Sequence, residues 1–256
     1  MRRLHFLEIH DQSWCPAVVR DAATDYLRLA VEVSGQTKTL VPVLLDVMEA
    51  SGERHIVDLC SGGGGPLPSM VAMLRAEGLP VTATLTDAMP GPALAAQCEA
   101  SGGAIRCEIE PVDALAVPRR LSGLRTLFNA FHHFRPDEAR SILADAMREQ
   151  SPICVVEFVE RTPAAMLGML FSPLAALLLM PRLRPLRWGA LALTYLLPIV
   201  PFVVMFDGFV SCLRVYDERE LAELTRGLAA PGWRWETRRV RLAGPLHATV
   251  LVGRPG

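Results

Sequence analysis

The sequence predicts a single α/β domain, a layered sandwich around a seven-stranded, mostly parallel sheet. Three observations support this fold. Five short β-rich segments alternate with helical patterns between residues 55 and 159, which is typical of βαβ units. A glycine run directly follows the first segment, and two further extended segments close the chain. With 256 residues, 51% of them apolar, the chain can bury a core under both faces of such a sheet.

The expected elements follow one another in a regular order. Apolar residues recur twice at helical spacing within residues 1–50, so helices should precede the sheet. The five predicted strands are 55–60, 81–86, 104–110, 124–128 and 153–159. Helices are expected around 70–74, 94–100, from Pro136 onward, and over 217–228. Segments 233–240 and 247–253 are predicted to pair as two closing strands in antiparallel fashion.

The composition limits the classes of partner and compartment. Lys plus Arg (26) nearly balances Asp plus Glu (27), so we expect no nucleic acid partner. The six cysteines are widely spaced, without a CxxC pair or zinc-type histidine spacing, which predicts free buried thiols and no metal. The amino terminus has no uninterrupted apolar run after its two arginines, which predicts a cytoplasmic chain without a signal peptide.

The strongest local signal is the segment from Ile56 to Gly65, which reads IVDLCSGGGG. A glycine-rich turn after a strand allows a ligand to approach the backbone closely, and the next helix presents unpaired amides to it. An acid, Asp58, lies four residues before the first glycine. Dinucleotide-binding loops place G-x-G-x-x-G there instead, whereas an amino-acid ligand with a cationic amine favours an acid.

With these residues the chain resembles the class I, Rossmann-like methyltransferases that use S-adenosylmethionine (SAM). Their first motif typically reads D-x-G-x-G-x-G; Asp58, Gly62 and Gly64 match it, and Cys60 replaces the first glycine. The resemblance implies a three-layer αβα fold with one antiparallel strand, and SAM as the cofactor. It also implies that Asp58 lies near the methionine end and that Cys60, Ser61, Gly62 and Gly64 contact the cofactor.

Two further acids follow strands two and three. Asp87 ends the second strand, where the family places a carboxylate that binds both ribose hydroxyls. A helix N-cap is the competing role for Asp87. Asp113 follows the third strand, at the position that in the family contacts the adenine amine, with Ala114 beside it. An ordinary turn is the alternative for Asp113.

The fourth strand ends in NAFHHF, residues 129–134. In many small-molecule members of the family a similar segment lines the cofactor and acceptor pocket, which implies Asn129 at the cofactor and Phe131 at the acceptor. A neutral imidazole there could accept the acceptor's proton, so His133 or His132 is the candidate general base. The alternatives are that one histidine only packs while the other lines the pocket, and that transfer proceeds by positioning alone.

Residues after the fifth strand are candidates for the acceptor side. Glu157 and Glu160 flank the end of that strand, and ligands of such sheets bind outside the strand carboxyl ends. We expect Glu157 near the acceptor and Glu160 either there or paired with an arginine. Arg214 and Tyr216 lie in a polar segment that we expect to close the acceptor side, with ion pairing as the alternative for Arg214.

The stretch between residues 163 and 206 is strongly apolar. Its only charges are Arg182, Arg184 and Arg187, which separate two apolar runs of about bilayer-spanning length. Both runs contain prolines, and a transmembrane hairpin would have to carry the three arginines across the membrane against the positive-inside bias. Both facts argue against a transmembrane hairpin. Three interpretations remain: a lid over an apolar acceptor pocket, a monotopic surface that inserts into one leaflet of a membrane, or an apolar dimer interface.

These observations lead to one predicted function and two alternatives. We expect methyl transfer from SAM to a small, hydrophobic or membrane-derived acceptor, by a cytoplasmic protein or one peripheral on the inner face of the membrane. A membrane-associated SAM-binding or scaffold protein without turnover is the first alternative, and a nicotinamide-dependent reductase is the second. The expected parts are an N-terminal helical cap (1–50), a SAM-binding core (51–162), an apolar insertion (163–206) and a closing helix and strands (207–256).

Overall fold

The computed structural model describes residues 1–184, 186–242 and 246–256, and it contains the predicted seven-stranded sheet. The strand order is β3-β2-β1-β4-β5-β7-β6. The bounds are β1 (His55–Asp58), β2 (Thr82–Leu85), β3 (Ile105–Cys107), β4 (Leu124–Phe128), β5 (Ile153–Glu157), β6 (Trp233–Arg241) and β7 (His247–Pro255). β1 to β5 run parallel, and β7 runs antiparallel to both neighbours. The predicted fold class is therefore confirmed.

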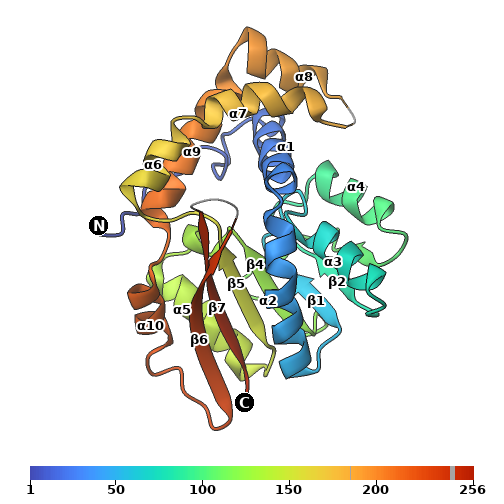
Figure 1. The fold of residues 1–256 in the computed structure, drawn as a ribbon, viewed down its shortest axis with the longest axis vertical. Helices are drawn as coiled ribbons and strands as arrows, with labels where there is room; N and C mark the ends of the chain where they lie inside the picture. Colours follow the sequence, from blue (N-terminus) through green and yellow to red (C-terminus); the bar gives the residue numbers. More distant parts are fainter. Residues whose placement is uncertain (185, 243–245) are drawn as a thin grey trace.

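Helices cover both faces of the sheet and complete three layers (Figure 1). Successive strand residues point to opposite faces, so Ile56 and Val57 of β1 enter two different cores. The first core is shared with α2 (Gln36–Ser51), α3 (Leu67–Ala76) and α4 (Pro92–Ala100). The second is shared with α5 (Pro136–Arg148) and α10 (Glu218–Thr225). β4 and β5 lie between both cores, which explains why β5 is buried along its whole length.

The apolar stretch forms helices beyond one end of the sheet, and most of them pack with α1 (Ala17–Ser34) (Figure 1). These are α6 (Pro163–Met169), α7 (Ser172–Leu179), α8 (Trp188–Leu191) and α9 (Ile199–Arg214), with single turns at Met180–Arg182 and Ala192–Leu196. We expected the insertion to end at residue 206, but α9 continues without a break to Arg214. We call residues 163–214 the apolar cap.

Helix lengths in the apolar cap bear on its relation to a membrane. Among the described residues, no single helix is both long and apolar enough to cross a bilayer. Two pairs of consecutive helices, each bent at a short break, meet the requirements of length and composition only when both helices of the pair are taken together. Pro163–Met169 and Ser172–Arg182 bend by 42°, and Trp188–Leu196 and Ile199–Arg214 bend by 80°.

Residues 1–16 form an irregular segment, here called the N-terminal arm, that runs beside α9. The Leu4 amide donates to the Leu213 carbonyl at 3.0 Å. Arg20 of α1 holds the other end of the arm, because its guanidinium donates to the carbonyls of His10 and Gln12, each at 3.0 Å. The arm therefore connects the start of the chain to a helix that is nearly 200 residues distant in sequence.

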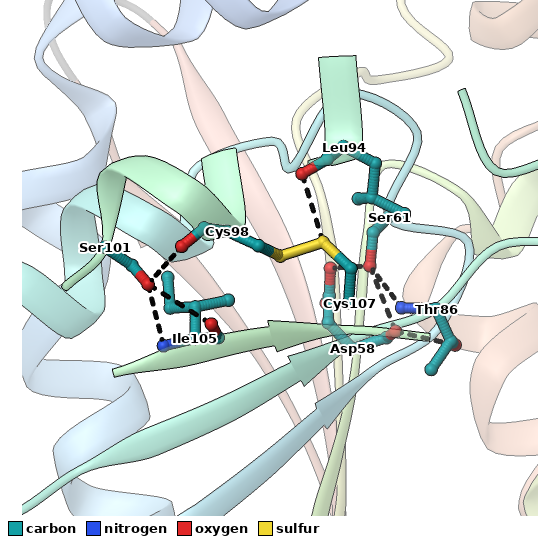
Figure 2. Close-up of a disulfide and its surroundings, with 8 residues drawn as sticks. All are labelled: Asp58, Ser61, Thr86, Leu94, Cys98, Ser101, Ile105 and Cys107. Carbon is teal, nitrogen blue, oxygen red and sulfur yellow. Dashed lines mark hydrogen bonds between the residues drawn. A yellow bond between two sulfur atoms is a disulfide. The ribbon is translucent and has the colours of Figure 1, made fainter. Parts of the chain in front are cut away.

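One cysteine prediction is wrong. Cys98 of α4 and Cys107 of β3 form a disulfide, with Cα atoms 6.0 Å apart (Figure 2). The turn between them is closed by Ser101, whose hydroxyl donates to the Cys98 carbonyl at 2.7 Å and accepts from the Ile105 amide at 3.0 Å. This turn folds α4 back against β3, so two thiols nine residues apart in sequence meet. Cys15, Cys60, Cys154 and Cys212 are free, as expected.

Candidate functional site

A cleft lies at the carboxyl ends of β1, β2 and β4, where the order of the strands reverses. From β1 the chain proceeds outward to β2 and β3, then crosses to β4 and β5 on the other side. Ligands of open α/β sheets bind at such a point because the loops on its two sides diverge. The cleft has a volume of about 420 Å³, and its walls come from the sheet loops, α1 and the N-terminal arm.

The loop after β1, residues 59–66, bends sharply along one wall of the cleft. Cys60, Gly62, Gly64 and Gly65 all have positive φ angles, of 57°, 54°, 95° and 51°. Cys60 stands where the resembled motif has a glycine, and it adopts the left-handed conformation that glycine favours. Burial, followed by the charge of Asp87, raises the pKa of the Cys60 thiol, so this thiol is neutral rather than a reactive thiolate.

Asp58 lies behind this loop, and not on the cleft wall where we expected it. Its buried carboxylate accepts hydrogen bonds from the Ser61 and Thr126 hydroxyls, each at 2.6 Å. Ser61 also accepts from the Thr86 amide at 3.2 Å, so Asp58 ties the loop to the end of β2 (Figure 2). Burial raises the pKa of Asp58 to about 7, against the opposing effect of the two hydroxyl donors.

Asp87 presents its carboxylate directly at the cleft, beside the loop. Its oxygens accept from the Gly62 amide at 2.7 Å and the Met89 amide at 2.8 Å. The two other predicted residues nearby do not line the cleft. Asp113 is exposed and accepts from the Leu115 amide of its own turn, as its alternative role required. Ala114 is buried in the core under the sheet.

The end of β4 contributes Asn129 and His133 to the cleft. Asn129 has a φ of 52°, and its side-chain oxygen accepts from the Phe158 amide, which ties β4 to β5. The Nδ1 atom of His133 lies 2.7 Å from an Asp11 oxygen. Although burial raises it, the pKa of Asp11 is held well below its usual value by the bond to His133.

His132 and Glu157 form a buried pair and do not line the cleft. Glu157 accepts from the His132 amide at 2.9 Å and lies 2.7 Å from its Nδ1. Burial lowers the pKa of His132, but the Glu157 carboxylate outweighs this effect and raises it overall. Of the two adjacent histidines, only His133 faces the cleft. We expected Glu157 beside an acceptor, but in the structure its carboxylate orients His132 instead.

The four residues predicted for the substrate side also lie outside the cleft. Phe131 is fully buried in the sheet core, and the Tyr216 hydroxyl beside it donates to the Phe134 carbonyl at 2.8 Å. Glu160 pairs with Arg239 and lines a separate cavity of about 350 Å³. Arg214 is buried and pairs with the N-terminal arm.

The predicted N-terminal helical cap came without any assigned site residue, although the N-terminal arm and α1 together form one wall of the cleft. Arg214 lies 3.1 Å from Glu8 and 3.3 Å from Asp11, and Asp207 of α9 accepts from the His10 amide at 3.1 Å. These contacts place His10 and Asp11 on the cleft wall. Further lining residues come from one face of α1: Arg20, Asp21, Thr24, Leu27, Arg28 and Val31. The sequence signal was the polar run EIHDQ at 8–12, in a segment without helical periodicity.

Comparison with known proteins gives a match at the level of the fold. No protein-family model and no curated protein matches the chain. The fold is similar to the plantazolicin methyltransferase BpumL in complex with SAH, with a TM-score of 0.55 and 8% identity over 97% of this chain and 93% of BpumL. It is also similar to the pyocyanin biosynthetic protein PhzM, with a TM-score of 0.53 and 16% identity over 89% of this chain and 56% of PhzM.

These similarities identify the architecture as the fold of class I methyltransferases. The chain spans about half the length of PhzM and nearly all of BpumL. The sheet order, the reversal point and the loop after β1 are the parts of the fold that form the cleft.

Proposed function

We propose that the protein transfers a methyl group from SAM to a nucleophilic atom of a small, hydrophobic acceptor. The observation that carries this proposal is the Asp87 carboxylate, which faces the cleft at the end of β2 beside a glycine loop at the end of β1. The fold match to BpumL, whose structure holds SAH, supports the same cofactor. A volume of about 420 Å³ lies within the range of small-ligand and cofactor sites.

The residues at this end of the cleft fit a nucleoside. Each Asp87 oxygen accepts one backbone amide and retains a lone pair, so the carboxylate can also accept from two vicinal hydroxyls. The glycines let the ligand approach the backbone. Leu27, Met89 and Phe158 supply apolar surface for the flat ring system. When bound, SAM supplies an electrophilic methyl group on a positively charged sulfur.

The other end of the cleft fits the acceptor. His10, Asp11 and His133 bring imidazole and carboxylate groups to the lining of the cleft. We assign uptake of the acceptor's proton to this group, in which His133 is oriented by Asp11. His132 is not the base, because its ring is fully buried against Glu157.

The apolar cap favours a lipophilic acceptor and contact with a membrane surface. Large apolar side chains are exposed along it: Phe171, Leu174, Leu178, Trp188, Leu196, Leu197 and Phe202. The stretch 163–206 has no acidic residue and three arginines, which suits anionic head groups. We expect the protein to float with anionic vesicles and not with neutral ones. A dimer in solution that excludes vesicles would assign this surface to self-association instead.

The direct test is transfer of a labelled methyl group from SAM into a lipid extract. We expect wild-type protein to label a lipid-soluble product and Asp87→Ala to label none. Asp113→Ala is the matched control, since Asp113 is an acid in the segment after β3, the strand beside β2, and lies outside the cleft. SAM binding without product would favour the scaffold alternative, and tight NADH binding without SAM binding would favour the reductase.

A further inference from the structure

Four metal-ligand side chains meet where the N-terminal arm crosses the cleft. Glu8, His10, Asp11 and His133 each offer one ligand atom, and these atoms all lie within 4.8 Å of one another. We propose that this carboxylate–histidine cluster binds one divalent transition-metal ion at the acceptor end of the cleft. The role of this ion in the reaction rests on the proposed methyl transfer, whereas the binding of the ion does not depend on it.

The two histidines are oriented as metal-binding histidines are. His10 Nδ1 lies 2.8 Å from Asp207, and His133 Nδ1 lies 2.7 Å from Asp11. A carboxylate only accepts hydrogen bonds, so each Nδ1 carries a hydrogen and Nε2 is the nitrogen of each ring that a metal ion could bind. Metal-bound histidines commonly bond a carboxylate through the other nitrogen in this way, which fixes the ring and the tautomer.

One oxygen of Glu8 points to a missing partner. Glu8 is 1% exposed, and its Oε1 accepts from Ser211 at 3.1 Å and pairs with Arg214 at 3.1 Å. Its Oε2 is buried without a hydrogen-bond partner among the residues that the structure describes. A buried carboxylate oxygen without a partner is costly, and a bound cation would remove that cost.

The spacing of the free atoms also fits a small ion. Glu8 Oε2 lies 3.6 Å from His133 Nε2, and His10 Nε2 lies 3.4 Å from an Asp11 oxygen. Ligands that bind zinc at about 2.1 Å in a tetrahedron are separated by about 3.4 Å. Both distances are too long for hydrogen bonds of normal strength and are close to this ligand separation.

The charges balance for a divalent ion. Glu8, Asp11 and Asp207 supply three carboxylates, and Arg214 supplies one guanidinium among them. With both histidines as neutral ligands, the three carboxylates and the guanidinium would leave the group with two negative charges. Mixed imidazole and carboxylate ligands suit Zn²⁺, Fe²⁺ or Co²⁺ rather than Mg²⁺ or Ca²⁺, which prefer oxygen ligands alone.

The position of the cluster suggests what the ion would do. His10, Asp11 and His133 line the cleft, whereas Glu8 lies behind them, so a coordination position can face the acceptor. An acceptor hydroxyl oxygen bound there would lose its proton more readily and become the nucleophile. In the metal-bound protein His133 would be a ligand and positioning residue rather than the proton acceptor, and the proton would leave from the acceptor oxygen to solvent.

The test measures metal binding without SAM. Chelator-treated protein is titrated with Co²⁺, whose visible absorption reports nitrogen and oxygen coordination, and then with Zn²⁺ in competition. We expect one equivalent to bind, with affinity about 100-fold or more lower in Glu8→Gln and His133→Gln and about tenfold lower in Asp207→Asn. His55→Gln is the control, because His55 bonds Thr82 and Thr84 on the sheet and should leave affinity unchanged.

Separate measurements keep this inference distinct from the methyltransferase proposal. Circular dichroism melts identify any variant that is unfolded, and Asp207→Asn then replaces it in the comparison. If wild-type protein takes up no Co²⁺ or Zn²⁺, or if Glu8→Gln and His133→Gln bind as tightly as wild type, the metal site is refuted. SAH binding by the metal-free protein would still support methyl transfer in that case. Metal uptake without any SAH binding would refute only the methyl transfer.

Discussion

The two walls of the cleft differ in the distance along the chain between their residues. The loop wall consists of lining residues between Cys60 and Pro66 together with Asp87, which follow two successive strands. The opposite wall joins the N-terminal arm to His133 and, through buried ion pairs, to Arg214 of α9. The loop wall is thus formed by segments that follow neighbouring strands, whereas the arm wall is assembled by tertiary contacts between segments distant in sequence. We infer that the first binds the cofactor and the second determines the acceptor.

The largest expected effect comes from removing the Arg214 side chain, whose guanidinium holds the arm wall together. Arg214→Ala should lower the free energy of unfolding by about 3–5 kcal/mol, because it leaves the buried Glu8 carboxylate, and the half-buried Asp11 carboxylate beside it, without their guanidinium partner. Chemical denaturation measures the change. Arg239→Ala, which removes an exposed pair with Glu160, should cost less than about 1 kcal/mol. Equal losses in the two variants would show that the arm is not held as described.

The second effect concerns the buried acid behind the loop wall. The pKa of Asp58 is about 7 in the folded state, above the ordinary value near 4 of the unfolded chain. The folded state therefore retains the proton longer, so stability from this group is complete below pH 4 and is lost as pH rises through 7. The loss amounts to about 4 kcal/mol at most.

Asp58→Asn removes this titration while keeping a side chain of the same shape. We expect the stability of the variant to fall less between pH 4 and pH 7 than that of wild type, as measured by urea denaturation across that range. Parallel curves for the two proteins would contradict the raised pKa.

The third effect distinguishes the cleft acids. Asp87→Ala should weaken SAM binding by about 100-fold, since two charge-assisted hydrogen bonds are lost. Equilibrium dialysis with labelled SAM measures it. Asp113→Ala should bind as wild type does, because its carboxylate only closes its own turn. If the two variants lose affinity equally, Asp87 does not have the assigned role.

The smallest effect compares two neighbouring glycines of the loop. A Cβ on Gly64 would lie 3.1 Å from Gln97 and 3.2 Å from Pro68, whereas one on Gly65 would meet nothing within 4 Å. Both have positive φ, so each alanine substitution costs about 1 kcal/mol of backbone strain. Gly64→Ala should cost about 1–2 kcal/mol more because of crowding. Thermal melts of both variants test whether the loop packs against α3 and α4 as observed.

The same comparison explains what could be predicted from the sequence. Alternating strands and helices made the sheet predictable, and Asp87 was found because the resembled family places an acid at the end of the second strand. Local patterns do not fix side-chain direction after a strand, so Glu157 and Phe131 were expected at the cleft but are buried. The arm wall has no local signature, since its ion pairs join residues about 200 positions apart. The disulfide likewise depends on the turn at Ser101.

Calorimetric titration of the wild-type protein with SAH tests the role of the cleft most directly. We predict saturable heat for one site per chain, and a loss of that heat in Asp87→Ala under conditions where the variant remains folded. Absence of heat with either SAM or SAH, for protein that unfolds cooperatively in a parallel melt, would contradict the assignment of this cleft to the cofactor.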